Sequence, residues 1–220
     1  MAGDGWLLGA LPEDERRLVL ASMRRRRFAR GEVVFHEGDP GDTVHFIDKG
    51  HVAIRVSTPL GDVATLTVLG PGDGFGEGAL LADDSLRTAS AVAIGATETR
   101  TLHRQEFERL RSDHPQVERL LTDVLAAQVR RLSEHLLEAL YVPAETRVLR
   151  RLLMLCGTYP AAADGTTTAP ITQDDLATMA GTARPTANRV LQAAQDDGLV
   201  VLGRGRVTVV DRAGLERRAR

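Results

Sequence analysis

The chain has 220 residues, of which 43% are hydrophobic and 26% are charged, as in ordinary globular proteins. This length holds one large domain or two small ones that can each bury a core. The single cysteine, Cys156, excludes a disulfide framework and an all-cysteine metal or iron–sulfur site within one chain; we expect it buried on an apolar helix. The N-terminus lacks a secretory pattern and no apolar stretch is long enough to span a bilayer, so we expect a cytoplasmic protein without membrane contacts.

The net charge of −2 is unevenly distributed along the chain. Residues 141–220 hold 11 arginines and 8 acidic residues, a net charge of +3, whereas residues 1–140 hold 17 basic and 22 acidic residues, a net charge of −5. A basic C-terminal part on an acidic body is typical of a sensor joined to a DNA-binding module.

The first half of the chain predicts a helix followed by many short strands. Apolar residues have helical spacing over residues 7–23, and Pro12 is placed as at a helix start. From Glu32 to about His103 the pattern changes to short β-type runs separated by turn residues, which indicates an all-β barrel or sandwich. The predicted strands are residues 33–36, 44–48, 52–56, 63–69, 89–94 and 97–102, with turns that include 37–42 and 59–62.

One motif in this region has the chemistry of an anion site. Backbone N–H groups of Gly78 and Ala79, at the start of a short helical turn, can hold a phosphate, and Arg87 can form two parallel hydrogen bonds to it. Glu77 can accept a hydrogen bond from a ribose hydroxyl. The alternative is that Glu77 and Arg87 pair with each other and brace the barrel. The candidate effector-binding residues are Gly76, Glu77, Gly78, Ala79, Arg87 and Thr88.

The sequence does not indicate an enzyme. The six histidines, at positions 36, 45, 51, 103, 114 and 135, are scattered, and we expect each in a turn or at the surface. A metalloenzyme with a cupin-type barrel would bring two histidines and a glutamate together on one strand pair. There is no serine–histidine–acid pattern and no phosphate loop with a lysine. We therefore expect no catalytic residues, no metal and no cofactor.

A long helical stretch begins at Gln105, is interrupted near residues 114–115 and runs to about Tyr141. Apolar positions recur in steps of three and four over six turns, which predicts a coiled-coil-like seam. Such a seam favours a two-fold homodimer; the alternative is a helix packed on its own domain. The predicted stripe is Val117, Leu121, Val124, Leu125, Gln128, Leu132, Leu136 and Ala139.

The C-terminal part predicts a helix-turn-helix motif. Pro143 marks a hinge, residues 145–155 are helical, and residues 157–170 have the composition of a loop. Thr172 begins the next helix as its N-cap, with an acid three residues later, and Gly181 ends it. Pro185 suits the first turn of a second helix, which would enter the major groove of DNA.

A hairpin follows, with strands at 198–202 and 206–210 around Gly203-Arg204-Gly205. Arginine can pair with guanine and asparagine with adenine, while the hairpin arginines can reach phosphates. The alternative is a helical bundle with a hairpin that has no DNA contact. The candidate DNA-binding residues are Thr172, Gln173, Ala183, Arg184, Thr186, Asn188, Arg189, Arg204 and Arg206.

The order of these parts resembles the cyclic-AMP receptor protein/FNR (Crp/Fnr) family of bacterial transcription regulators, from about Phe28 to Val210. The resemblance lies in residues 37–42, 46–50, 75–89, 171–172 and 184–191. It implies an α+β fold: a cyclic-nucleotide-binding β-roll (jelly-roll barrel) in 1–112, a dimerisation helix in 113–141 and a winged helix-turn-helix in 142–220. It also implies cAMP as the effector, double-stranded DNA as a partner and RNA polymerase as a further candidate partner.

Two positions depart from the family pattern. Cyclic-AMP-responsive members place a threonine–serine pair on the dimer helix, whereas this chain offers Ser133 and His135, so Ser133 is a further candidate for effector binding. Pro185 stands where many members carry a glutamate that reads a base, so we expect a different operator. The alternatives are the same DNA-binding dimer with another effector or none, and a barrel protein that binds nucleotide without DNA.

Overall fold

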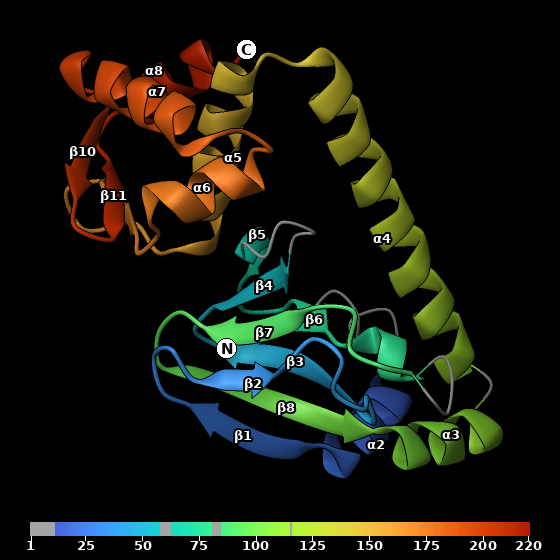
Figure 1. Ribbon diagram of the computed structural model, residues 1–220. Helices are drawn as coiled ribbons and strands as arrows, with labels where there is room; N and C mark the ends of the chain where they lie inside the picture. Colours follow the sequence, from blue (N-terminus) through green and yellow to red (C-terminus); the bar gives the residue numbers. More distant parts are fainter. Residues whose placement is uncertain (1–11, 58–62, 81–84, 115) are drawn as a thin grey trace. The chain divides into compact units, whose positions relative to one another are not determined.

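A computed structural model describes residues 12–57, 63–80, 85–114 and 116–220 (Figure 1). The chain forms two compact units, and their boundary in the long helix falls between Arg131 and Leu132. Several sequence predictions lie outside the described residues or side chains: the apolar residues Leu7, Leu8 and Leu11, the turn at 59–62, and the side chains of Val117, Leu121, Val124 and Gln128.

The first unit contains a β-roll of two antiparallel four-stranded sheets, in the orders β1-β8-β3-β6 and β2-β7-β4-β5; residues Ala64–Thr67 of β5 are grouped with the second unit. All six predicted strands are confirmed within a residue or two. Among the described strands the two sheets do not join into one closed ladder, which agrees with the expected β-roll. The strands are β1 (Arg24–Phe28), β2 (Val33–Phe35), β3 (Thr43–Lys49), β4 (Val52–Ser57), β5 (Val63–Leu69), β6 (Gly74–Phe75), β7 (Ser90–Ala93) and β8 (Thr97–His103).

Sequence patterns missed β1 and β6 for physical reasons. Strand β1 is an edge strand whose four arginines are all exposed, so it has no apolar alternation. Strand β6 has two residues and pairs only with His45 and Phe46 of β3. Short or edge strands are defined by their hydrogen-bond partners rather than by a local pattern.

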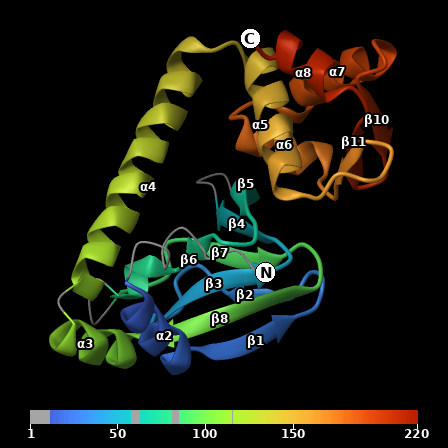
Figure 2. The same ribbon diagram turned by 180° about the vertical axis from the view of Figure 1, so that it is seen from behind.

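Two helices close one end of the roll. In both views α2 (Glu13–Ser22) and α3 (Arg104–Asp113) lie together beside the ends of β1 and β8 (Figure 2). Val19 of α2 and Phe107 of α3 are buried together with Val44 and Leu102 of the sheet. Leu80 belongs to the same cluster, so this core also anchors the short 3₁₀ helix η1 (Glu77–Leu80) that carries the predicted anion motif.

The histidine prediction is wrong for His45 and His51, which are 6% and 9% exposed. The ring of His45 lies among the rings of Phe28, Phe35 and Phe75. Its ring stacks on Phe75 with the ring centroids 5.0 Å apart, and Nδ1 lies 3.3 Å from Thr99 Oγ1. Burial, and then the positive charge of Arg87, lowers the pKa of His45 to about 3.

The second unit contains a three-stranded sheet, β10-β11-β9, surrounded by helices. The predicted loop at 157–170 is wrong in part, because α5 continues to Thr158 and β9 pairs with β11. Helix α8 was also not predicted; its N-cap Asp211 accepts a hydrogen bond from Gly214 N–H at 2.8 Å. The elements are α5 (Ala144–Thr158), β9 (Thr167–Ala169), α6 (Gln173–Met179), α7 (Arg184–Asp196), β10 (Val200–Gly203), β11 (Arg206–Val209) and α8 (Arg212–Arg218).

The predicted helix-turn-helix is confirmed at its caps. The Thr172 hydroxyl accepts from Asp175 N–H at 3.0 Å, which satisfies a donor at the start of α6. Gly181, with a φ of 58°, ends the helix, and Pro185 lies in the first turn of α7.

Cys156 is buried on α5 as expected, and burial raises the pKa of its thiol to about 11. The predicted α+β class, with β-roll, long helix and winged helix-turn-helix, is therefore confirmed.

The long helix α4 (Gln116–Tyr141) has 26 residues and spans about 39 Å at about 1.5 Å per residue. Leu132 and Leu136 of the predicted stripe are 60% and 59% exposed, and Val129 and Leu140 are exposed beside them. A contiguous exposed apolar stripe indicates a surface that another molecule covers. Among the described residues, no helix is both long and apolar enough to cross a membrane.

We expect the stability of the first unit to depend on pH through His45. Because the folded-state pKa is about 3 and the unfolded value is 6.5, the unfolded chain binds the extra proton between these values. The stabilisation is thus complete above pH 6.5 and is lost as the pH falls toward 3, by up to about 1.4 kcal/mol per pH unit. Calorimetric unfolding in steps from neutral pH downward measures this slope.

A His45→Gln variant is the control, because an amide can still bond to Thr99 but does not titrate. Its free energy of unfolding should fall less steeply with acid. An equal slope in the variant and the parent would show that other groups cause the acid sensitivity.

Candidate effector site and DNA-binding surface

The predicted turn at 37–42 lies against the segment that carries Arg87. Gly38 N–H donates to Arg87 O, Arg87 N–H donates to Asp39 O, and Gly41 N–H donates to Ser85 O, each at 2.8 Å. These bonds hold the glycine-containing turn at 37–42 against the segment that carries Arg87. The Arg87 side chain beneath them is buried, with the residue 7% exposed.

The guanidinium of Arg87 is held by neutral groups. Its Nη1 donates to Thr43 O at 2.8 Å and to Gly76 O at 3.1 Å, and Nη2 donates to Thr43 Oγ1 at 3.0 Å. Its Cζ lies 4.1 Å from the centre of the Phe35 ring. Within the described residues, Nε is buried without a hydrogen-bond partner. The bracing partners of Arg87 are therefore β3 and Gly76 rather than the Glu77 carboxylate.

The electrostatics of Arg87 favour an anion beside it. Burial lowers the pKa of the guanidinium, while the carboxylates of Asp42, Asp39 and Glu77 raise it, in that order. Among the described residues the direct hydrogen-bond partners of Arg87 are uncharged, and the three carboxylates act on it without such a bond. A phosphate could bring negative charge into direct contact with the guanidinium and accept two hydrogen bonds from it.

The motif residues Glu77, Gly78 and Ala79 lie together on η1, directly after β6. Ala79 N–H donates to Gly76 O at 3.1 Å, so this predicted phosphate donor already has a partner. Thr88 is exposed, next to Arg87 in the chain. Ser133 lies in the second unit. The first unit thus brings together the other six candidates, and Ser133 is not among them.

Sequence reasoning missed Arg104, the first residue of α3. Its Nε donates to Ala79 O at 2.5 Å, and its Nη2 donates to Gly41 O. Arg104 therefore fixes η1 against the turn at 37–42 and orients the peptide groups around Ala79. No local pattern marks this role, because both acceptors are backbone carbonyls far from Arg104 in the chain.

Helix α7 has one buried and one exposed face. Ala187, Val190, Leu191 and Ala194 are buried, whereas the candidates Arg184, Asn188 and Arg189 are exposed. Thr186 is half-buried on the flank. Gln192, which was not predicted, is exposed one turn beyond Asn188 and so shares its face. Its position four residues after Asn188 could have identified it.

The other DNA-binding candidates lie at the two ends of the motif. Thr172 also donates to Asp175 Oδ2 at 2.6 Å, so its hydroxyl is engaged in the cap of α6. Gln173 is half-buried, and Ala183 is the exposed N-cap of α7. Arg204, in the hairpin turn, and Arg206, at the start of β11, are exposed. All nine candidates therefore belong to the second unit.

The structure gives Gly76 a role that differs from that of Gly78 in the same motif. Gly76 has a φ of 77°, and a Cβ built on it lies 2.6 Å from Arg87 Nη1, whereas a Cβ at Gly78 meets nothing within 4 Å.

We expect Gly76→Ala to destabilise the first unit by about 1–3 kcal/mol through backbone strain and displacement of Arg87. Gly78→Ala, the matched control, should unfold within about 0.5 kcal/mol of the parent in calorimetry. Equal losses in the two variants would contradict the tight packing of Gly76 against Arg87.

Comparison with known proteins identifies the family. Residues 25–114 match the family model of the cyclic nucleotide-binding domain, and residues 146–218 match that of the Crp-like helix-turn-helix domain. The chain is 36% identical over 218 residues to a cyclic AMP receptor protein of Thermus thermophilus, covering 98% of this chain and 97% of the relative. It is 33% identical over 195 residues to a CRP-like cAMP-activated global transcriptional regulator of Mycobacterium tuberculosis, covering 88% and 87% of the two chains.

Solved structures agree with these matches. The catabolite activator protein of Thermus thermophilus is 35% identical with 97% of both chains covered and a TM-score of 0.56. A second transcriptional regulator of the CRP family from Thermus thermophilus is 26% identical, with 88% of this chain and 96% of that chain covered and a TM-score of 0.74. The β-roll motif, the winged helix-turn-helix and these similarities lead to one conclusion: the chain belongs to the Crp/Fnr family of transcription regulators.

Proposed function

We propose that two copies of this protein bind double-stranded DNA through α7 and the β10–β11 hairpin, and that cAMP bound beside Arg87 controls this binding. The observation that carries the effector assignment is the buried Arg87 guanidinium, which sits between two glycine-containing turns and has only uncharged hydrogen-bond partners among the described residues. In this proposal residues 1–112 sense the effector, 113–141 dimerise and 142–220 bind DNA in the cytoplasm.

Cyclic AMP offers each group of the site a chemical partner. Its phosphate can accept from Arg87 and Thr88 and from backbone N–H groups of the turn formed by Gly76 and Gly78. Its ribose hydroxyl can donate to Glu77. Two relatives that share more than 30% identity with this chain over most of its length are named for cAMP, which supports this nucleotide as the first choice.

A second candidate is the same DNA-binding dimer with a different effector or none. The observation in its favour is on α4, which lacks the threonine–serine pair of cyclic-AMP-responsive members and offers Ser133 and His135 instead. Without that pair, selectivity for adenine would need other contacts. The DNA-binding half of the proposal does not depend on this choice.

The exposed residues of the second unit fit the known forms of DNA recognition. Arg184, Asn188 and Arg189 project from α7 and can bond to base edges in the major groove. Arg204 and Arg206 on the hairpin, with the N-terminal ends of α6 and α7 at Thr172, Gln173 and Ala183, can bond to phosphates. These contacts give orientation, whereas the α7 side chains give sequence preference.

The exposed stripe on α4 supports a homodimer. Leu132, Leu136 and Leu140 would lie against the same residues of a second copy, as an isologous interface requires. Two recognition helices would then read half-sites roughly 34 Å apart, one turn of DNA. RNA polymerase is the partner that such a regulator would meet at a promoter.

The effector assignment is tested by calorimetric titration of the purified protein with cAMP. We expect binding with a dissociation constant on the order of micromolar, and about a tenfold or greater loss in Arg87→Gln because a hydrogen bond to a charged group is removed. Arg27→Gln, an equal change of charge on the exposed strand β1, should leave the affinity unchanged. Absence of heat at several temperatures in the parent protein would favour the second candidate.

The DNA assignment is tested by fluorescence anisotropy with a duplex selected from random sequences. Arg189→Ala should weaken binding to the selected duplex by about 1–3 kcal/mol, with less effect on unrelated DNA, because a base contact carries sequence information. Arg204→Ala should weaken binding to both duplexes alike. It should also reduce the slope of log K against log salt concentration by about one, because one phosphate contact fewer releases about one counterion fewer. Unchanged selectivity in Arg189→Ala would show that α7 is not the reading helix.

A further inference from the structure

The carbonyl groups at the end of α6 find their donors in two different ways. Gly181 N–H donates to Thr178 O and Thr182 N–H donates to Ala177 O, each at 3.0 Å, which is the local pattern of a glycine-terminated helix. Within the described part of the chain, the next three carbonyls, of Met179, Ala180 and Gly181, have no such local donors, because the chain turns there toward α7.

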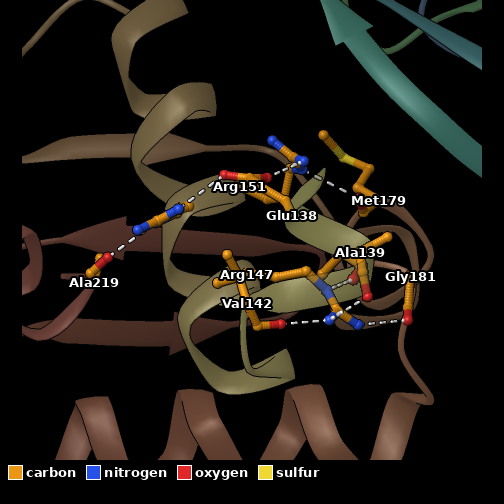
Figure 3. Close-up of polar contacts among 10 residues, drawn as sticks. Glu138, Ala139, Val142, Arg147, Arg151, Met179, Gly181 and Ala219 are labelled. Carbon is orange, nitrogen blue, oxygen red and sulfur yellow. Dashed lines mark hydrogen bonds and ion pairs between the residues drawn. The ribbon is translucent and has the colours of Figure 1, made fainter. Parts of the chain in front are cut away.

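Two arginines of α5 supply these donors. Arg151 Nε donates to Met179 O at 3.2 Å, Arg147 Nε donates to Ala180 O at 2.8 Å, and Arg147 Nη2 donates to Gly181 O at 3.0 Å (Figure 3). Arg147 and Arg151 are four residues apart, so they lie on one face of α5. The turn of the helix-turn-helix is thus bonded to α5 through side chains.

The same two arginines also bond to the end of α4. Arg147 Nη1 donates to Val142 O at 2.7 Å and more weakly to Ala139 O at 3.5 Å. Arg151 Nη2 donates to Glu138 Oε2 at 2.5 Å (Figure 3). Both helix ends carry partial negative charge, which a guanidinium stabilises. Each arginine therefore connects the C-terminal end of α4 with the C-terminal end of α6 or the turn that follows it.

The ion pair in this arrangement is largely buried, and the hydrogen bonds depend on the fixed geometry of the guanidinium groups. The side chains of Arg151 and Glu138 are 10% and 20% exposed, so their ion pair is less screened than a surface pair. Arg150 donates to the other oxygen of Glu138 at 3.2 Å, which fixes the carboxylate further. A planar guanidinium reaches several acceptors in fixed directions, which a lysine ammonium cannot do.

We infer that Glu138, Arg147 and Arg151 form a clamp that makes the last turn of α4 move as one body with the end of α6 and the turn that leads into the DNA-reading helix. Pro143, which the sequence interpretation takes as the hinge, lies inside the clamped segment. The bend that reorients the DNA-binding unit is therefore N-terminal to Glu138. The boundary between the compact units, between Arg131 and Leu132, agrees with that position.

Hydrogen–deuterium exchange of the full-length protein tests the clamp directly. Arg147→Lys and Glu138→Gln should speed exchange of the amides at 179–183 by about tenfold, together with those at 139–142, because local opening of either element releases the other. Amides of β10 and β11 should keep the parent's rates. Arg212→Lys, an exposed arginine of the same unit that pairs with Glu216 of its own helix, is the matched control and should change neither segment.

Two exchange results would overturn the clamp. Unchanged rates at 179–183 in both variants would show that the arginines do not hold the turn. Faster exchange spread evenly over the second unit, β10 and β11 included, would show that these residues serve only general stability. Glu138→Gln alters a residue at the edge of the core, so it remains informative if Arg147→Lys does not fold.

The second arm measures DNA affinity, and it rests on the proposed function that α7 reads DNA. Arg147→Lys should weaken binding to the selected duplex by about fivefold or more, within the usual range of coupling between sites. Pro143→Ala should bind within about twofold of the parent, because a clamped segment tolerates loss of the proline ring. If Pro143→Ala weakened DNA binding more than Arg147→Lys did, the hinge would lie at Pro143 and not N-terminal to Glu138. If the parent protein itself fails to bind any duplex, the proposed function fails while the exchange result still decides the clamp.

Discussion

Backbone carbonyl groups that end a helix or a turn inside a protein need hydrogen-bond donors, and leaving one unpaired costs about 1–3 kcal/mol. In both units of this chain, arginine side chains supply those donors at the place where function is assigned. Arg87 and Arg104 bond to carbonyls around η1 in the β-roll, and Arg147 and Arg151 bond to carbonyls at the turn between α6 and α7. The positions of the predicted anion motif and of the reading helix depend on these bonds.

The two sets of arginines differ in what else they contact. Among the described residues the hydrogen-bond partners of Arg87 are neutral, so a phosphate can replace or add to them with a gain in charge compensation. Arg151 already has the Glu138 carboxylate, so an anion would have little to add there. The first arrangement suits a ligand that comes and goes, and the second suits a permanent connection between helices.

Local sequence patterns predicted most of the regular elements and several of their ends, but not β1, β6, β9 and α8. The apolar spacing of α4, the strand-and-turn alternation of the β-roll, and the caps Thr172 and Gly181 all depend on residues within a few positions of each other. The candidate residues of α7 were also accessible from sequence, because a helix with one apolar face must expose the other. Gln192 was the position on that face that sequence reasoning missed.

The sequence by itself determined the order of the elements, the class of fold, and which residue types stand at the candidate sites. Only the tertiary structure decided that β1 and β9 pair at sheet edges and that His45 turns into the core. It also decided the partners of Arg104 and Arg147, which are carbonyls 25 and 33 residues away. Every residue carries a carbonyl, so no residue type marks which carbonyl a distant arginine will meet; only the folded path of the chain brings them together.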